Sequence, residues 1–429
     1  MNKKQTKKML KTLIILCFAS LIVLSSANDP FLGYKGETGF IPVTSMKDEL
    51  FYWFFPSQRD PANDPLVVWL TGGPGCSSEL AIFMENGPFK IDPKNLKLSL
   101  NEYSWNKGAN LIYVDQPIGT GYSNPVRSSY DQNEDQVSLH LYNFLVNWLE
   151  KHPSYKGRPL FLLGESYAGH YIPAISAYIA RHKTPEINFI GFGIGNGLVD
   201  VYYQYPSYAT FALDNGLTNL TTIQKARKML AQCQTDIRVR DHERAWIDCQ
   251  GGMREILGND GPQFNVYDIR KPCAHPPLCY DTSYIDNFLA QPEIIDALGV
   301  RGREWSECNT EVHMALEDDM FTSLRDDMSY LLENGYTALL YYGDSDFICN
   351  WYGGLEMANN INWSRKNEFN VASFKPWKNY GEYKQVGPLT FLRVFGAGHL
   401  VPLDNPAGAL DILETFLKGW AIQTSEVSI

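Results

Sequence analysis

The chain has 429 residues and is 44% hydrophobic and 13% aromatic, enough apolar material for a sizeable core, which excludes a disordered or low-complexity protein. Its formal net charge is −11, and loss of residues 1–27, which hold five lysines and no acidic residue, would leave −16. This excludes nucleic acid as a partner, because phosphate binding needs a basic surface.

The N-terminus has the pattern of a secretory signal peptide, which we expect over residues 1–27. Five lysines precede the apolar run 13–24, and Ser25-Ser-Ala27 supplies a cleavage site. The run is too short to span a bilayer comfortably, and no later segment is apolar enough. We therefore expect an exported protein without stable membrane insertion, found in the lysosome, in the vacuole or outside the cell.

Export changes how the cysteines are interpreted. Seven of the eight lie after residue 27, which predicts three disulfides and one free thiol. Cys273 and Cys279 could form a metal site with His275, but a small disulfide loop is favoured in an exported chain, so no metal is expected. Sequons at Asn219 and Asn362 agree with glycosylation in the same compartment.

Short apolar runs alternate with longer amphipathic segments, which is typical of an α/β protein with a mostly parallel sheet and helices on both faces. In chain order we expect strands at 66–70, 110–114, 159–163, 189–194, 338–342 and 389–395, and helices at 135–152 and about 406–420. Between about 200 and 310 the pattern changes to helical segments, loops and five cysteines. We interpret this stretch as a cap inserted into a single domain spanning 28–429.

A glycine-rich loop, Trp69-Leu-Thr-Gly-Gly-Pro-Gly-Cys-Ser-Ser78, follows the first strand. Glycine N–H groups approach an oxyanion closely because no Cβ stands in the way. We expect the N–H groups of Gly73 and of Tyr167, further along the chain, to form an oxyanion hole. A tight turn without a catalytic role is the alternative.

The segment Gly164-Glu-Ser-Tyr-Ala-Gly-His170 lies between an expected strand and an apolar helix. It has the Gly-x-Ser-x-small pattern of a nucleophile elbow, a strained turn that needs small neighbours. Ser166 is therefore the candidate nucleophile, and His170 is expected to be structural. The glycines of 191–197 resemble a dinucleotide loop, but the first two fall within a strand, so no cofactor is expected.

A nucleophilic serine needs a base and an orienting acid, which hydrolases with this elbow supply in the order Ser, Asp, His. Asp344 and Asp346 both follow the strand 338–342, and spacing alone leaves the choice between them open. His399 follows the strand 389–395 on a Gly-rich loop, a setting that the other histidines lack. Such loops over a parallel sheet gather functional groups, so we expect a catalytic triad.

These motifs together resemble the serine carboxypeptidase family, from about residue 34 to residue 420. The matching segments are 69–78, Val114-Asp-Gln-Pro-Ile-Gly-Thr-Gly-Tyr-Ser123, 164–169, Gly343-Asp-x-Asp346 and Gly398-His-Leu-Val-Pro402. The resemblance implies an α/β-hydrolase fold and the release of C-terminal residues from peptides and proteins through an acyl-enzyme on Ser166. It selects Asp346 as the orienting acid, with His399 as the base.

The resemblance also assigns further site residues. It places the terminal carboxylate of the substrate on Thr71, Gly72, Glu85 and Glu165, with the two glutamates sharing a proton. Because two like charges in contact raise a pKa, peptidase activity favoured by acid pH is predicted. The apolar neighbours of the substrate are expected to be Leu198 and Ile348 on the acyl side and Leu400 on the leaving-residue side, with Cys349 nearby as the free thiol. The implied disulfides are Cys76–Cys308 and Cys273–Cys279, with Cys233–Cys249 as the remaining pair.

Thr71 departs from the family pattern, because many of its peptidases have Asn there. Thr keeps a hydroxyl donor but loses the amide. Some plant acyltransferases on this scaffold share the Thr, as do family members that continue like Glu79-Leu-Ala81. An acyltransferase with the same triad is therefore the alternative function, and a non-catalytic binding or protective protein is a third. A homodimer is also left open.

Overall fold

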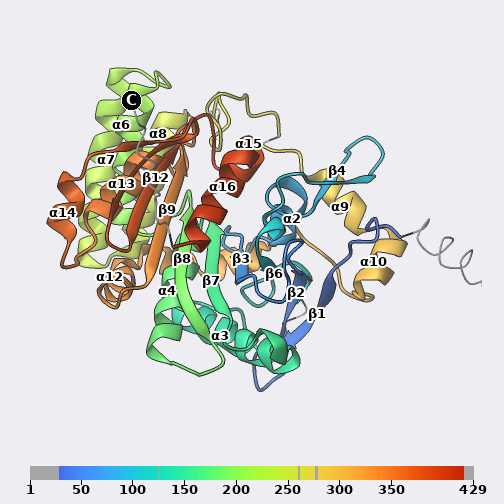
Figure 1. Ribbon diagram of the computed structural model, residues 1–429. Coiled ribbons are helices and arrows are strands. Elements are labelled where there is room, and N and C mark those ends of the chain that lie inside the picture. Colours follow the sequence, from blue (N-terminus) through green and yellow to red (C-terminus); the bar gives the residue numbers. More distant parts are fainter. Residues whose placement is uncertain (1–28, 125, 259–260, 276–278, 420–429) are drawn as a thin grey trace, which may run out of the picture.

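The computed structural model describes residues 29–124, 126–258, 261–275 and 279–419, so the signal peptide expected at 1–27 lies outside the described residues (Figure 1). One sheet of ten strands runs through the molecule in the order β1-β2-β6-β3-β7-β8-β9-β12-β11-β10. The strands are β1 (Glu37–Pro42), β2 (Glu49–Phe55), β3 (Leu66–Leu70), β6 (Asn110–Val114), β7 (Pro159–Glu165), β8 (Asn188–Gly195), β9 (Thr337–Gly343), β10 (Lys375–Trp377), β11 (Gly381–Val386) and β12 (Leu389–Val394).

The six central strands, from β6 to β12, are parallel to one another, and the outer pairs are antiparallel. The expected α/β architecture with a mostly parallel sheet is confirmed. Each expected strand is present within two residues of its predicted ends, but the four outer strands β1, β2, β10 and β11 were not predicted. A separate hairpin consists of β4 (Phe89–Ile91) and β5 (Leu98–Leu100).

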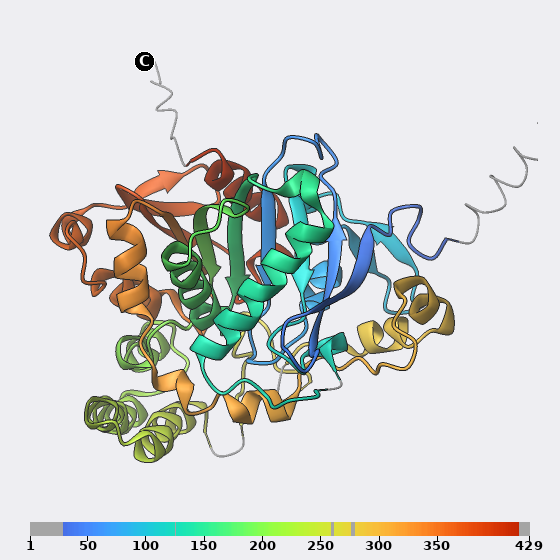
Figure 2. The same cartoon turned by 90° about the horizontal axis from the view of Figure 1, so that it is seen from below.

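Helices cover both faces of the sheet. On one face lie α3 (Glu134–Lys151), α4 (Ala168–Arg181) and α12 (Arg325–Glu333), and Figure 2 shows α3 lying across the strands there. On the other face lie α2 (Glu79–Met84), α15 (Val401–Asp404) and α16 (Pro406–Leu417). The period-two alternation of β3 divides its side chains between the faces: Val68 packs under the first layer, and Val67 and Trp69 pack under the second.

Between β8 and β9 the described residues supply helices and none of the strands of the main sheet. The helices are α5 (Val201–Gln204), α6 (Ser207–Asp214), α7 (Leu220–Val239), α8 (His242–Leu257), α9 (Ser283–Leu289), α10 (Pro292–Leu298), α11 (Thr310–Ala315) and α12. After β9 come α13 (Trp351–Asn359) and α14 (Lys366–Val371). A disulfide, Cys233–Cys249, joins α7 to α8. Within the described part of the chain, the structure holds no helix with the length and apolar character needed to cross a membrane.

Candidate active site

Ser166 occupies the sharp turn between β7 and α4. Its φ is 62°, a left-handed conformation that is unfavourable for a residue with a side chain. The turn is held by hydrogen bonds from the Ser166 N–H to the Gly195 carbonyl (3.1 Å) and from the Leu198 N–H to the Ser166 carbonyl (3.0 Å). A Cβ on Gly164 would lie 2.4 Å from the Leu70 carbonyl oxygen, which explains the glycine two residues before the serine. The elbow therefore displays Ser166 at the carboxyl edge of the sheet.

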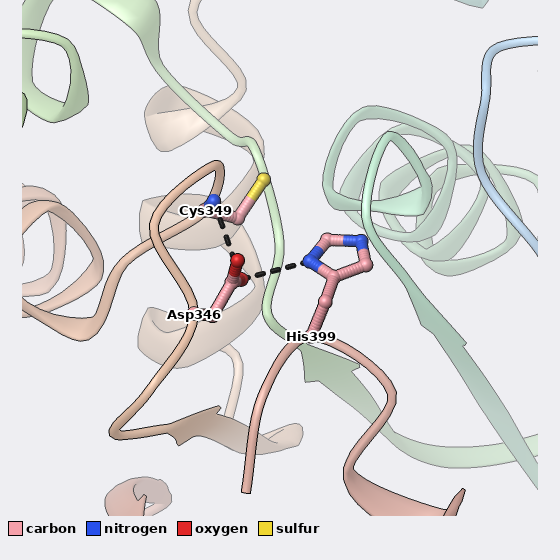
Figure 3. A group of neighbouring side chains, drawn as sticks. All are labelled: Asp346, Cys349 and His399. Carbon is pink, nitrogen blue, oxygen red and sulfur yellow. Dashed lines mark hydrogen bonds and ion pairs between the residues drawn. The ribbon is translucent and has the colours of Figure 1, made fainter. Parts of the chain in front are cut away.

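His399 and Asp346 meet at the same edge, after β12 and β9 (Figure 3). The Nδ1 atom of His399 lies 2.8 Å from Oδ2 of Asp346. Asp346 is fully buried, and its carboxylate also accepts hydrogen bonds from the Asn196 side-chain amide (2.8 Å) and from the N–H groups of Ile348 (3.0 Å) and Cys349 (3.2 Å). A carboxylate held in this way fixes the imidazole with Nδ1 as donor, which leaves Nε2 as the basic nitrogen.

The structure distinguishes Asp344 from Asp346, a choice that the sequence spacing left open. Asp344 accepts a hydrogen bond from the Gly396 N–H at 3.0 Å and lies near Arg393, away from the imidazole. Asp346 alone of the two contacts His399. The carboxylate that contacts the imidazole is therefore Asp346, the one that the family resemblance selected.

Ser166 and His399 line one cavity of about 530 Å³. The other expected site residues on its wall are Thr71, Gly72, Gly73, Glu85, Glu165, Ile348 and Leu400. Leu198 and Cys349 do not line it. With Ile348 they surround a much smaller space beside it, so their contact with a substrate stays a prediction. Both side chains belong to the buried core.

The glycine loop approaches the elbow closely. A Cβ on Gly72 would lie 2.3 Å from the Tyr167 backbone nitrogen and 2.8 Å from the Ser166 Cβ. Gly73 has a φ of 113°, which favours glycine, and a Cβ there would lie 2.8 Å from the Cys76 nitrogen. The backbone beside Ser166 is thus free of side chains, the space that a developing oxyanion needs.

Hydrogen bonds to buried neighbours hold Thr71 in place at the cavity wall. The Trp69 indole N–H donates to Thr71 Oγ1 at 3.1 Å, and the Thr71 N–H donates to Ser78 Oγ at 3.2 Å. Because the hydroxyl oxygen already accepts a hydrogen bond, its proton is free to be donated into the cavity. Thr71 can therefore replace one donor of the amide that many family peptidases have at this position.

Glu85 and Glu165 form a buried carboxyl pair in the same cavity. Both are 2% exposed, and the two carboxyl groups are hydrogen-bonded to each other. Burial raises the pKa of Glu85 to about 7, and burial together with Glu85 raises the pKa of Glu165 well above its usual range. Glu85 Oε2 has no hydrogen-bond partner among the described residues. At acid pH the pair therefore holds a proton that it can share with a bound carboxylate.

A second buried carboxyl pair, Glu79 and Asp115, lies behind the glycine loop and was not predicted. Neither side chain is exposed. Glu79 accepts hydrogen bonds from the Ser77 hydroxyl (2.5 Å) and the Trp305 indole (3.3 Å), and Asp115 accepts one from the Ser78 N–H (3.1 Å). Burial raises the pKa of both carboxyl groups. The pair thus secures the end of the loop that begins at Thr71.

Asn196 was also missed by the sequence analysis. It directly follows β8, and its side chain donates to Asp346 and accepts from the Gly343 N–H at 3.0 Å. The only signal was its place in the Gly191–Gly197 segment, which sequence reasoning considered solely as a dinucleotide loop. The strand assignment of its first glycines is confirmed.

The disulfides pair as the resemblance implied: Cys76–Cys308, Cys233–Cys249 and Cys273–Cys279, with Cys349 free and buried. Cys349, Asp346 and His399 place one ligand atom each within 4.8 Å of one another, which is a spacing that a metal ion could use. Burial and Asp346 raise the pKa of the Cys349 thiol well above its usual range, which disfavours the thiolate that a metal would need. Both sequon asparagines, Asn219 and Asn362, are exposed.

Known proteins are similar to this chain in sequence and in fold. The family model described as serine carboxypeptidase matches residues 27–419. The chain is 41% identical to serine carboxypeptidase-like 48 from Arabidopsis thaliana, over 86% of this chain and 75% of that protein. It is 37% identical to serine carboxypeptidase S10 family member 1 from Dictyostelium discoideum, over 96% of this chain and 100% of that protein. The crystal structure of Kex1Δp, a prohormone-processing carboxypeptidase from Saccharomyces cerevisiae, is 28% identical and matches with a TM-score of 0.80, over 89% of this chain and 91% of that one.

Proposed function

Because the chain belongs to the serine carboxypeptidase family and has the α/β-hydrolase fold, we propose that it is a serine-type carboxypeptidase. It would release single residues from the C-termini of peptides and proteins at acidic pH. The observation that carries the proposal is the buried Glu85–Glu165 pair, which lines the same cavity as Ser166 and His399. A proton-sharing pair beside a nucleophile recognises a carboxylate, the group that only a chain terminus supplies at that position.

In the proposed reaction, Ser166 Oγ attacks the carbonyl of the last peptide bond while His399 Nε2 takes the hydroxyl proton. Asp346 stabilises the imidazolium that forms, and backbone N–H groups of Gly73 and Tyr167 stabilise the oxyanion. His399 then gives the proton to the leaving amine, and the last residue departs. Water attacks the acyl-enzyme with His399 again as the base, which releases the shortened peptide and restores Ser166.

Acyl transfer by the same triad is the second candidate, and the observation that favours it is Thr71 at a position where many family peptidases have Asn. In that reaction an acceptor hydroxyl or amine would replace water in the second step. We also propose export, with the lysosome, the vacuole or the extracellular space as the destination, since three disulfides persist only in an oxidising compartment.

An N-blocked dipeptide and a glucose ester of the same blocked acyl group, incubated in parallel at pH 5 with a hydroxyl acceptor, distinguish the two reactions. The carboxypeptidase proposal predicts release of the last residue from the dipeptide, and Ser166→Ala abolishes it. Asp344→Asn, on the same loop as the orienting acid but away from the imidazole, is the matched control and keeps the activity. Transfer of the acyl group to the acceptor without dipeptide hydrolysis would replace the proposal with acyl transfer.

A further inference from the structure

The released residue of a substrate must face one particular wall of the cavity. The Cα of the released residue lies between the scissile nitrogen, which is near Ser166, and the terminal carboxylate, which is on the Glu85–Glu165 pair. Its side chain therefore projects from a point beside that pair. The helix α2 runs directly into Glu85, and its residues Leu80 and Met84, one turn apart, both line the cavity. This wall is apolar and suits an aliphatic stem.

Glu307 lines the same cavity and contributes a third carboxyl group to it. Its backbone is fixed, because its carbonyl accepts the Ser77 N–H at 2.8 Å and the next residue, Cys308, is bonded to Cys76 in the glycine loop. Its Oε2 accepts a hydrogen bond from the Thr282 hydroxyl at 2.6 Å. No described lysine or arginine forms an ion pair with Glu307, and none of the described residues that line the cavity is a lysine or arginine.

The groups around Glu307 do not neutralise it. Asp286 on α9, another acid, interacts with it electrostatically, as do Tyr267 and Tyr284. His313 on α11 lines the cavity but is exposed. Burial raises the pKa of Glu307, and Asp286 adds to the rise. A carboxyl group in a cavity without a cation of its own is a site for a cation on the ligand.

We infer that Glu307 binds the cationic end of a C-terminal arginine or lysine, whose aliphatic stem packs on Leu80 and Met84. The inference rests on the proposed carboxypeptidase function, because it concerns the side chain that such an enzyme releases. It adds a preference for a positively charged C-terminal residue to the preference for apolar contact that the Leu80 and Met84 wall provides. Since an ionised Glu307 attracts the cation and a protonated one does not, the preference grows as the pH rises from 5 toward 6.5.

The test compares kcat/KM for N-blocked dipeptides that end in arginine, citrulline or leucine, at pH 5.0 and 6.5. Citrulline has the shape of arginine without the charge. We expect arginine to exceed citrulline on the order of tenfold at pH 6.5 and by less at pH 5.0. Glu307→Gln, which can still accept from Thr282, brings the ratio to about one and leaves leucine within about twofold. Glu304→Gln, an exposed acid on the same segment that does not line the cavity, leaves the ratio unchanged.

Equal rates for arginine and citrulline in the wild type, or an unchanged ratio in Glu307→Gln, would overturn the inference. So would a parallel loss on all three substrates, which is what a purely structural residue would give. Calorimetric titration of the Ser166→Ala protein with the arginine and citrulline dipeptides separates this question from catalysis. If no dipeptide is hydrolysed, the proposed function fails. Tighter binding of the arginine compound, lost on Glu307→Gln, still supports the inference, and equal binding rejects it.

Discussion

The carboxyl pair makes the pH dependence of peptide hydrolysis a quantitative prediction. Burial raises the pKa of Glu85 to about 7, so Glu85 keeps its proton at pH 6 and loses it at pH 8. Once it is ionised, Glu85 no longer donates to the substrate carboxylate and repels it. The group is an acid with a raised pKa, so the binding-competent form is the low-pH form and is lost as the pH rises through about 7.

The size of the effect follows from the fraction of the protein in which Glu85 is protonated. One titration centred near pH 7 lowers that fraction about tenfold between pH 6 and pH 8. The kcat/KM for an N-blocked dipeptide acid should fall by the same factor. The C-terminal amide of that dipeptide has no carboxylate and serves as the internal reference, because its hydrolysis depends on the triad and not on the Glu85–Glu165 pair.

The assay therefore measures kcat/KM for the dipeptide with a free C-terminal carboxylate and for its C-terminal amide, and follows the ratio of the two from pH 5 to 9. Lys90 offers an independent perturbation, because its ammonium group lowers the pKa of Glu85. It donates hydrogen bonds to the backbone carbonyls of Met84 (2.5 Å) and Glu85 (3.1 Å). Lys90→Met should move the midpoint of the ratio to higher pH. A ratio that is flat or rises between pH 6 and pH 8, or a midpoint that moves down in Lys90→Met, refutes this reasoning.

Three further predictions concern the groups behind the reacting atoms. Gly72→Ala places a methyl group against the Tyr167 backbone and should lower kcat about 100-fold or more, the loss seen when an oxyanion donor is removed. Asn196→Ala removes a hydrogen bond to a buried carboxylate and should lower kcat about tenfold, measured on the same dipeptide at pH 5. Glu79→Gln removes a carboxyl group whose pKa in the folded protein is raised by burial and by Asp115. Such a group makes the free energy of unfolding of the wild type fall as the pH rises. Between pH 5 and 8, measured by thermal unfolding, this fall should be smaller in Glu79→Gln by about 1 kcal/mol or more.

Each of these variants has an outcome that contradicts it. Circular dichroism and the melting temperature at pH 5 show whether a variant is folded. A folded Gly72→Ala protein with wild-type kcat would mean that the loop does not bind the oxyanion. Asn196→Ala with unchanged kcat would show that the triad is held without that amide. If Glu79→Gln follows the wild-type curve of stability against pH, the second carboxyl pair does not ionise across that range.

The central strands and the triad followed from sequence because their signals are local. Apolar runs such as 66–70 and 110–114 occupy β3 and β6 with the predicted bounds, and the elbow and the aspartate and histidine loops stand directly after strands. The outer strand β11 had no such signal, since its sequence Gly-Glu-Tyr-Lys-Gln-Val is largely polar. Lys384 in β11 is nevertheless 3% exposed, because its ammonium donates to Asn359 Oδ1 and the Phe369 carbonyl, contacts that only the fold brings together.

The remaining site residues depend on contacts between segments far apart in the chain. Asn196 acts on Asp346 across 150 positions, and Glu307 reaches the cavity because a disulfide fixes its neighbour to the glycine loop.

The most direct test of the central claim is the mass-spectrometric record of a defined peptide incubated with the protein at pH 5. The account predicts a ladder of products, each shorter by one residue from the C-terminus. The ladder should be absent with Ser166→Ala and strongly slowed when the peptide is amidated at its C-terminus. Cleavage within the peptide or from its N-terminus, or an intact peptide alongside wild-type labelling of Ser166 by a fluorophosphonate, would contradict the account.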